Sequence, residues 1–156
     1  MFPNPFIAPI FFDSCAFDGG SFVEQNSSIE ARAIVEQRGA GIELVHSVLK
    51  EIEYPNTPQN LRDESQGFIY TCEVNLNETE IANLAIIEKI IVGNGSLEKM
   101  KSDCRHVFEA QKYGGHYFIT TDLRLLKKSI PIKNNFALNI LKPSEFLAIL
   151  KIHIDI

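Results

Sequence analysis

The chain has 156 residues, of which 45% are hydrophobic and 22% are charged, values typical of one globular domain with a substantial core. The formal net charge of −5 disfavours a general polyanion binder. The three cysteines are widely spaced, which disfavours a disulfide framework. The chain contains neither a CxxC nor an HxxxH spacing, so a zinc site is not expected. Its apolar runs are shorter than a membrane span. We therefore expect a single cytoplasmic domain over residues 1–156, with reduced thiols and no membrane partner.

The first third of the chain is predicted to contain one strand and two helices. The opening "MFPNPFIAPIFF" carries three prolines and no basic start, so we interpret it as an extended lead-in to a strand over 7–12 and not as a signal peptide. "AFDGGS" follows as a turn or loop. A helix is predicted over 28–38, with a serine at its start and Gly39 after it. From residue 41, apolar residues recur at helical spacing and predict a second helix, which two prolines stop.

The middle third is predicted to be a polar loop followed by two long helices. The loop covers 54–67, and the segment 68–74, "FIYTCEV", is equally compatible with a strand and a helical turn. Helices are predicted over 77–92 and 96–115. Their expected end signals are Asn77 or Thr79, Gly93, Gly114 and Gly115.

The last third alternates strands and helices. We predict a strand over 116–120, a short helix over 122–128, one more strand within 131–140, a helix over 142–150 and a tail strand over 151–156. Ser144 is expected to cap the last helix. Strands alternating with helices predict an α/β layer fold with a mostly parallel central sheet.

Four carboxylates are candidates for one shared site. Ligands of parallel sheets bind outside the carboxyl ends of the strands, and Asp13 and Asp122 each directly follow a predicted strand end. Glu51 and Asp103 lie at the edges of the apolar faces of their helices, whereas Glu43 is predicted to be solvated. Taken singly, each acid is better explained as an ordinary cap or surface residue, because surface acids are common and most have no role.

The sequence resembles the PIN domain, in particular the VapC-type toxin ribonucleases of bacterial toxin–antitoxin pairs. The likeness covers most of the chain in the right order. Its most specific part is a helical aspartate followed, nineteen residues on, by an aspartate directly after a strand that ends in threonines. The segments that carry it are "IFFDSCAF", "SVLKEIE", "DCRHVFEAQKYGGHYFITTD" and "LKPSEFLAIL".

The resemblance implies a small three-layer α/β/α sandwich and a metal-dependent ribonuclease. The family uses an acidic cluster that binds Mg²⁺ or Mn²⁺ and hydrolyses phosphodiester bonds, usually in RNA. On this chain the catalytic and metal-binding cluster would be Asp13, Glu51, Asp103 and Asp122. Carboxylates gathered in one crevice repel one another, and hard divalent ions with oxygen ligands remove that conflict. The resemblance also implies RNA as substrate, an antitoxin protein as partner and a homodimer.

Five further residues are candidates for substrate contacts. Ser14, Thr120 and Thr121 match positions where the family has hydroxyl side chains. Arg124 and Lys127 closely follow Asp122 and are candidates for phosphate contacts, although each one taken singly is better explained as a solvated surface charge. The chain departs from the toxins at Cys15, where they often have asparagine.

Two other classes of function are compatible with parts of the pattern. A catalytically silent PIN-like module would keep the fold and act as a protein-interaction partner; the presence of all four acids disfavours it. An acid-pocket domain of the phospho-receiver kind would need paired early acids and a suitably placed lysine, and the chain matches that pattern poorly.

Overall fold

A parallel five-stranded sheet forms the centre of the protein. The computed structural model describes residues 2–52, 69–70 and 75–154. The strand order is β3-β2-β1-β4-β5, and every neighbouring pair is parallel, which confirms the predicted α/β class and sheet. The strands are β1 (Ile10–Phe12), β2 (Ile42–Leu44), β3 (Ile69–Tyr70), β4 (Tyr117–Ile119) and β5 (Asn139–Leu141).

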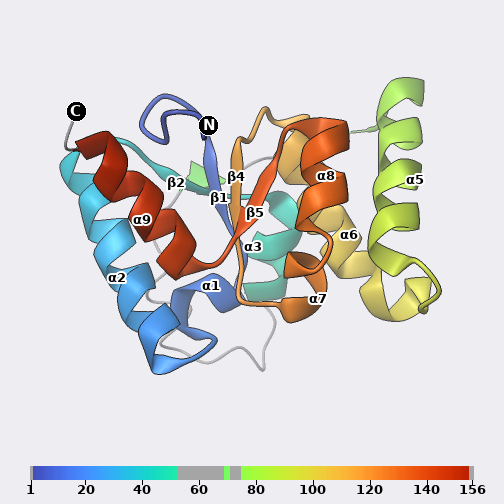
Figure 1. Cartoon of the computed structure of the whole chain (residues 1–156). Helices are drawn as coiled ribbons and strands as arrows, with labels where there is room; N and C mark the ends of the chain where they lie inside the picture. Colours follow the sequence, from blue (N-terminus) through green and yellow to red (C-terminus); the bar gives the residue numbers. More distant parts are fainter. Residues whose placement is uncertain (1, 53–68, 71–74, 155–156) are drawn as a thin grey trace.

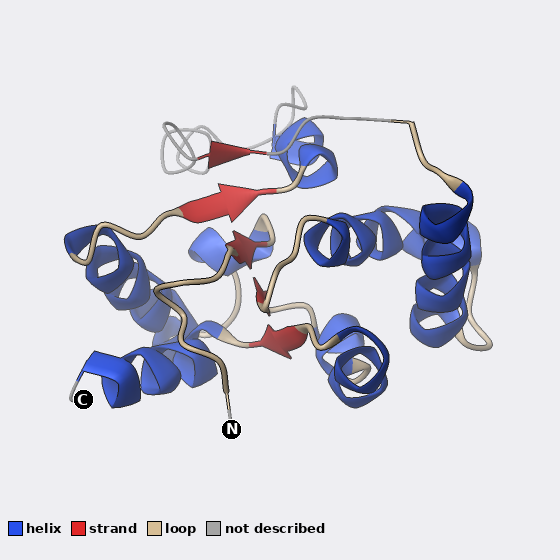
Figure 2. Ribbon diagram, turned by 90° about the horizontal axis from the view of Figure 1, so that it is seen from above, coloured by secondary structure: helices blue, strands red, loops and turns tan. Residues whose placement is uncertain are grey.

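Helices cover both faces of this sheet (Figures 1 and 2). On one face α2 packs against α9, and on the other α3 packs against α6, whose outer side carries α5. The arrangement is compatible with the expected three-layer sandwich. The helices are α1 (Cys15–Asp18), α2 (Phe22–Gln37), α3 (His46–Ile52), α5 (Glu78–Val92), α6 (Leu97–Lys112), α7 (Leu123–Leu126), α8 (Ser129–Phe136) and α9 (Pro143–Ile154).

The central strands are apolar runs that are buried on both faces. All three residues of β1 and of β4 have no exposed surface. Uninterrupted burial of this kind is characteristic of parallel strands between two helical layers. The sequence pattern that predicts these strands is therefore continuous hydrophobicity and not alternation of apolar and polar residues. β1 begins at Ile10, three residues later than predicted.

The two long helices of the middle third agree with their predicted end signals. The side chain of Asn77 accepts from the backbone N–H of Glu80, while the Glu80 carboxylate accepts from the N–H of Asn77. This capping box starts α5, and Gly93 follows its last residue. α6 ends at Lys112, just before Gly114 and Gly115.

Three predictions in the first third of the chain are wrong. The segment 16–21, predicted to be a turn or loop, begins with residues of α1. α2 begins at Phe22 and not at residue 28, because the Ser21 side chain caps it by accepting from the N–H of Glu24. The helix predicted from residue 41 begins at His46, and the preceding residues form β2. The three residues of β2 are too few to disturb the helical spacing of apolar residues on which that prediction was based. Glu43 accordingly lies half-buried in β2, and burial raises its pKa.

The C-terminal predictions also need correction. Residues 151–154 continue α9, so within the described residues no tail strand forms. Ser144 lies inside the first turn of α9 and does not cap it; its N–H and hydroxyl donate to the Glu24 carboxylate of α2, at 2.8 and 2.7 Å. Residues 129–136, predicted to be a connection and part of a strand, form α8, and the further strand is β5.

The remaining predictions fall partly outside the described residues. The polar loop predicted over 54–67 and the prolines expected to end α3 lie there. Of the segment 68–74, residues 69 and 70 form β3. Among the described helices, none combines the length and the apolar character that a membrane crossing requires.

Candidate functional site

The parallel register of β1 and β4 places Asp13 beside Thr120. Phe12 pairs with Ile119, so the residues that follow are neighbours at the carboxyl edge of the sheet. The Asp13 N–H donates to the Ile119 carbonyl at 2.9 Å, and the Thr120 hydroxyl donates to Asp13 Oδ2 at 2.8 Å. Asp13 is 4% exposed and Thr120 is fully buried. The predicted strand-end aspartate is therefore a buried, hydrogen-bonded carboxylate.

Burial is the main influence on Asp13. It raises the pKa of this carboxyl, the charge of Glu51 raises it further, and His106 and the Thr120 hydroxyl oppose the rise. The other carboxylate oxygen, Oδ1, accepts from the N–H of Ser14 at 2.8 Å. A negative charge at this position is thus costly unless a cation compensates for it.

Cys15 places a weak thiol donor beside Asp13 and Thr120. Its Sγ lies 3.5 Å from Asp13 Oδ2 and 3.3 Å from the Thr120 hydroxyl. Burial, together with the charge of Asp13, raises the Cys15 pKa to about 11. A thiol with a raised pKa is a poor source of thiolate, so this environment disfavours Cys15 as a nucleophile.

The second threonine of the strand end binds the α1 backbone. Thr121 Oγ1 donates to the Cys15 carbonyl at 3.1 Å, and the Thr121 N–H lies 3.4 Å from Cys15 Sγ. A Cβ at Gly19 would lie 2.4 Å from the Cys15 carbonyl oxygen and 2.9 Å from Thr121 Oγ1, so the tight end of α1 beside this strand end requires a glycine. Thr121 thus positions α1, and its hydroxyl is engaged within the protein.

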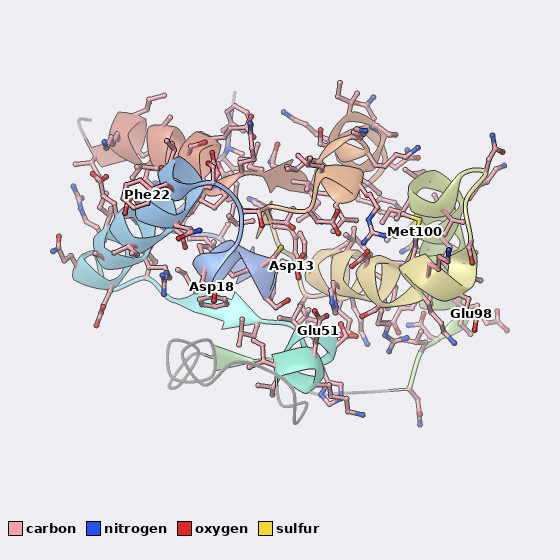
Figure 3. The ribbon with its side chains drawn as sticks, turned by 90° about the horizontal axis from the view of Figure 1, so that it is seen from below. Asp13, Asp18, Phe22, Glu51, Glu98 and Met100 are labelled. Atoms are coloured by element: carbon pink, nitrogen blue, oxygen red, sulfur yellow. The ribbon has the colours of Figure 1, made fainter. Side chains whose placement is uncertain are left out.

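Glu51 lies at the same edge, held through both of its oxygens. Its Oε1 accepts from the Ser14 hydroxyl at 2.9 Å, and its Oε2 lies 2.7 Å from His106 Nε2. Figure 3 shows Asp13 and Glu51 in the middle of the molecule, whereas Glu98 and Met100 lie at the outer end of α6. The hydrogen bond from His106 lowers the pKa of Glu51, which burial opposes. Glu51 is consequently a fixed carboxylate.

His106 is the residue that the sequence prediction missed. It is fully buried, and its second ring nitrogen, Nδ1, lies 2.7 Å from Ser47 Oγ. Burial disfavours its charged form, but the hydrogen bond to Glu51 and the charges of Asp13, Glu51 and Asp103 outweigh burial and raise its pKa. The spacing to Asp103 was the available signal, because residues three apart share one helix face.

A buried carboxylate fixes α3 relative to α6. Glu109 is 4% exposed; its Oε1 accepts from the N–H of Ser47 at 2.9 Å, and its Oε2 accepts from Arg105 Nε at 2.8 Å. Glu109 thereby satisfies a backbone donor in the first turn of α3. This anchor, with the bond between Ser47 and His106, sets the position from which Glu51 reaches the sheet edge.

One arginine joins the other two predicted acids. Arg124 Nη2 lies 3.4 Å from Asp103 Oδ2 and 3.2 Å from Asp122 Oδ2. Asp122 also caps α7, since its Oδ1 accepts from the N–H of Arg124 at 2.9 Å. The side chains of Asp103 and Asp122 are 18% and 19% exposed. Two acids nineteen residues apart in the chain thus share one cation.

Asp103 is the electrostatic link between the two halves of the site. Burial raises its pKa to about 6, and the negative charges of Asp122 and Asp13 contribute to the rise, while His106 and Arg124 oppose it. The four predicted carboxylates therefore belong to one interacting set. Among the described residues, however, no group of three or more His, Cys, Asp or Glu side chains is arranged so that it could hold an ion.

The raised pKa of Asp103 predicts a pH-dependent effect of Asp103→Asn on metal-free protein. The pKa rises from 3.8 to about 6 in the fold, so this carboxyl contributes stability below about pH 4 that is lost as the pH rises through 6. Asparagine cannot ionise. In EDTA, the melting temperature of the variant should exceed that of the wild type by roughly 3–6 °C at about pH 8, with the difference vanishing near pH 4. A difference that is constant across this range would contradict the assignment, since all other groups are common to both proteins.

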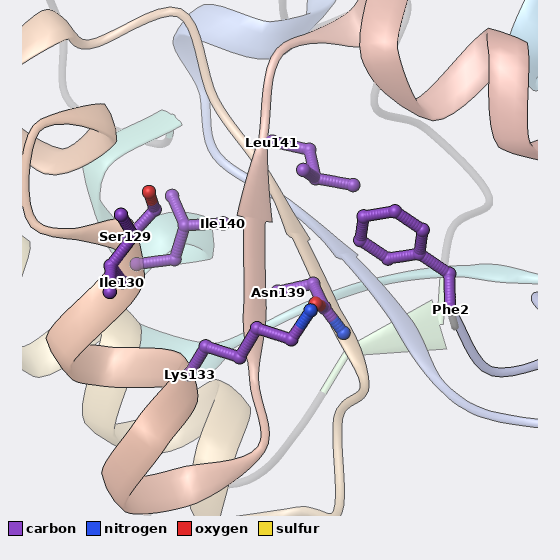
Figure 4. Close-up of a pocket in the computed structure, with 7 residues that line it drawn as sticks. All are labelled: Phe2, Ser129, Ile130, Lys133, Asn139, Ile140 and Leu141. Atoms are coloured by element: carbon purple, nitrogen blue, oxygen red, sulfur yellow. The ribbon is translucent and has the colours of Figure 1, made fainter.

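A cavity lies away from the acidic residues. Its volume is about 170 Å³, and it lies between β5, α8 and the N-terminal segment (Figure 4). The amide oxygen of Asn139 is buried there without a hydrogen-bond partner in the part of the chain that the structure describes. No predicted site residue lines it; the lining residues are Phe2, Ser129, Ile130, Lys133, Asn139, Ile140 and Leu141.

Comparison of the chain with protein-family models, with curated proteins and with solved structures found no match in any of the three. Function is therefore argued from the acidic residues at the carboxyl edge of the sheet.

Proposed function

We propose that the protein is a metal-dependent ribonuclease of the PIN type. The observation that supports this most is that Arg124 contacts both Asp103 of α6 and Asp122 at the end of β4, which brings these two acids together. The charges of Asp122 and Asp13 also contribute to raising the pKa of Asp103. The parallel sheet with helices on both faces agrees with the fold that the resemblance implies. Carboxylates in a partly buried site raise the pKa of one another because their negative charges repel. A bound cation relieves this repulsion, so such a site favours cation binding.

The donor chemistry of the site fits a hard divalent cation. Asp103, Asp122 and Asp13 supply only carboxylate oxygens, the ligands that Mg²⁺ and Mn²⁺ prefer. Arg124 lies against Asp103 and Asp122 and offsets part of their negative charge. A bound ion would lower the pKa of a water and offset charge that develops on the phosphate.

The chain itself would position the remaining reactants. Glu51 is held at both oxygens by Ser14 and His106, so it is suited to orient a water and less suited to move toward an ion. Arg124 and Lys127 have exposed side chains on α7 and next to it, where they can contact phosphate groups of RNA. The antitoxin partner, the homodimer and the cytoplasmic location rest on the resemblance and on the chain's composition.

The proposal predicts that Mn²⁺ binding requires Asp103. In a calorimetric titration the wild type should bind Mn²⁺, and Asp103→Asn should bind it at least about tenfold more weakly, because it loses a negative oxygen ligand. Glu98→Gln, an exposed acid at the outer end of the same helix, is the matched control and should bind as the wild type does.

The same proteins should be assayed on labelled RNA. Cleavage that requires Mn²⁺ or Mg²⁺ and is lost with Asp103→Asn supports the ribonuclease. Absence of metal uptake by the wild type would contradict it, and would favour the silent PIN-like module that acts as an interaction partner.

A further inference from the structure

The cavity beside β5 combines apolar walls with a few polar groups. Apolar side chains of α8 and β5 line it together with the ring of Phe2, and its polar groups come from Ser129, Lys133 and Asn139 (Figure 4). A concave, mostly apolar lining with few polar groups is typical of sites for small molecules. The volume is about 170 Å³, and an apolar cavity of about 150 Å³ admits benzene. The space therefore suits a molecule with a single ring.

Asn139 contributes an acceptor that the fold leaves without a donor. The residue is 4% exposed, and its Nδ2 donates to the His116 carbonyl at 3.0 Å. Because a carbonyl oxygen only accepts, this bond fixes which end of the amide is the oxygen. Oδ1 is then buried with no hydrogen-bond partner among the residues that the structure describes. A buried acceptor without a donor is costly, so an occupant that donates an N–H or O–H to it gains affinity.

A lysine and an aromatic ring meet at the same cavity. Lys133 of α8 and Phe2 of the N-terminal segment approach each other there, with Nζ 4.6 Å from the ring centroid (Figure 4). Both residues are exposed, and a cation–π contact at an exposed position is weak. The ammonium group can therefore turn from the ring to an anion, which opens the ring face for stacking. Lys133 and Phe2 thus supply a positive charge and a stacking surface beside Asn139.

We propose that this cavity binds a small anionic compound with a single ring that carries an N–H or O–H donor. The donor on the ring bonds to Asn139 Oδ1, the ring stacks on Phe2, and the anionic group pairs with Lys133. Pyrimidine mononucleotides and hydroxybenzoates share this chemistry, and binding experiments distinguish them. The inference does not depend on the proposed ribonuclease, because none of the four acids lines the cavity.

The N-terminal wall of the cavity is anchored to the rest of the fold. The Tyr117 hydroxyl of β4 donates to the carbonyl of Pro3, the residue directly after Phe2. In the same segment Asn4 Oδ1 accepts from the N–H of Phe6 at 2.9 Å, which closes a turn. On the other side α8 packs against β5. Binding between walls that are already in place costs little conformational entropy, which favours a small ligand.

The first test uses uridine monophosphate (UMP) and 4-hydroxybenzoate as probes. Calorimetric titration should detect one of them with a Kd of about 0.1–1 mM, as expected for a small ligand with few polar contacts. The same ligand should shift the backbone amide signals of Ser129, Ile140 and Leu141 in ¹H–¹⁵N NMR spectra. The tighter probe identifies the compound class. Binding of neither probe up to about 10 mM would overturn the proposal and would leave a buried water as the partner of Asn139 Oδ1.

Lys133→Gln and Phe2→Ala test the contacts with the anion and with the ring. The wild type should bind UMP at least about fivefold more tightly than uridine, which lacks the phosphate, and 4-hydroxybenzoate likewise more tightly than neutral 4-hydroxybenzamide. Lys133→Gln should lose this preference. Lys101→Gln removes an exposed positive charge on α6 that does not line the cavity, so this control should keep the preference. Phe2→Ala should weaken the charged and the neutral compound alike, by about fivefold.

Asn139→Leu tests the contact with the ring donor. The variant loses the buried oxygen, while the backbone N–H of residue 139, which donates to the His116 carbonyl at 2.9 Å, remains. The wild type should bind 4-hydroxybenzoate, or UMP, at least about tenfold more tightly than 4-methoxybenzoate, or N3-methyl-UMP, whose ring lacks the donor. Asn139→Leu should show no such preference.

Two further results would overturn the proposal. The first is equal affinity of the wild type for inorganic phosphate and for UMP, and the second is a loss with Lys101→Gln as large as with Lys133→Gln. Either would show attraction of anions without a site for the ring. Urea unfolding of the same preparations establishes that each variant is folded. If Asn139→Leu is not folded, the comparison of Lys133→Gln with Lys101→Gln decides.

Discussion

Replacement of Asp13 by asparagine is expected to lower metal-dependent RNA cleavage by at least about a hundredfold, because a negative oxygen at the centre of the acidic set is lost. The fold should survive. Asparagine keeps an oxygen that can accept from the N–H of Ser14. In the wild type the Thr120 hydroxyl donates to Asp13 Oδ2, and in the variant the asparagine NH₂ can donate to that hydroxyl instead. Burial already disfavours the charged form of Asp13, so a neutral side chain suits this position.

Asp18→Asn is the matched control for Asp13→Asn. It makes the same chemical change on α1, five residues along the chain and away from the strand end (Figure 3). Cleavage of labelled RNA and urea unfolding should be measured on the same preparations. Equal residual cleavage in wild type and Asp13→Asn, with both proteins folded, would refute the assignment of the acidic set as the active site.

Replacement of His106 by alanine is expected to lower the free energy of unfolding by about 3 kcal/mol. The change leaves a cavity beneath α3 and deprives Ser47 and Glu51 of a partner at 2.7 Å. His116→Ala, at an exposed position, is the control and should change the free energy of unfolding by less than about 0.5 kcal/mol. Urea unfolding measures both.

The pH dependence of this loss distinguishes a charged His106 from a packed neutral one. Its pKa is raised above 6.5 in the fold, so its charge contributes stability that is complete below that pH and is lost as the pH rises through the raised pKa. The difference between wild type and His106→Ala should therefore be larger near pH 6 than near pH 9. An equal difference at both pH values would show that His106 stabilises by packing alone.

The electrostatics of the site follows from how unequally its two basic side chains, His106 and Arg124, are held. His106 pairs with Glu51 from a fully buried position, whereas Arg124 pairs with Asp103 and Asp122 from an exposed one. The first pair fixes the position of Glu51. The second offsets the charge of the acids most suited to hold an ion. Stability and metal binding are thus sensitive to different residues, and the variants proposed above can separate them.

Elements whose signals are local could be predicted from the order of residues alone. The α5 capping box formed by Asn77 and Glu80 involves residues three apart, and the buried runs of β1 and β4 depend on continuous hydrophobicity. Such signals predicted the α/β class, the parallel sheet and the placement of Asp13 directly after a strand. Strand ends and helix faces supplied the four acids as candidates for one site, and the family resemblance gave them a role in catalysis and metal binding. The function drawn from it remains a prediction.

Only the tertiary structure decided which residues meet at the edge of the sheet. His106 contacts Glu51 because Glu109 anchors the first turn of α3 to α6, a contact between residues more than sixty positions apart in the chain. Ser144 binds Glu24 on α2, although its local pattern predicts a cap. Burial, charge compensation and hydrogen bonding at such positions depend on distances between elements, and these distances arise only when the helices pack on the sheet.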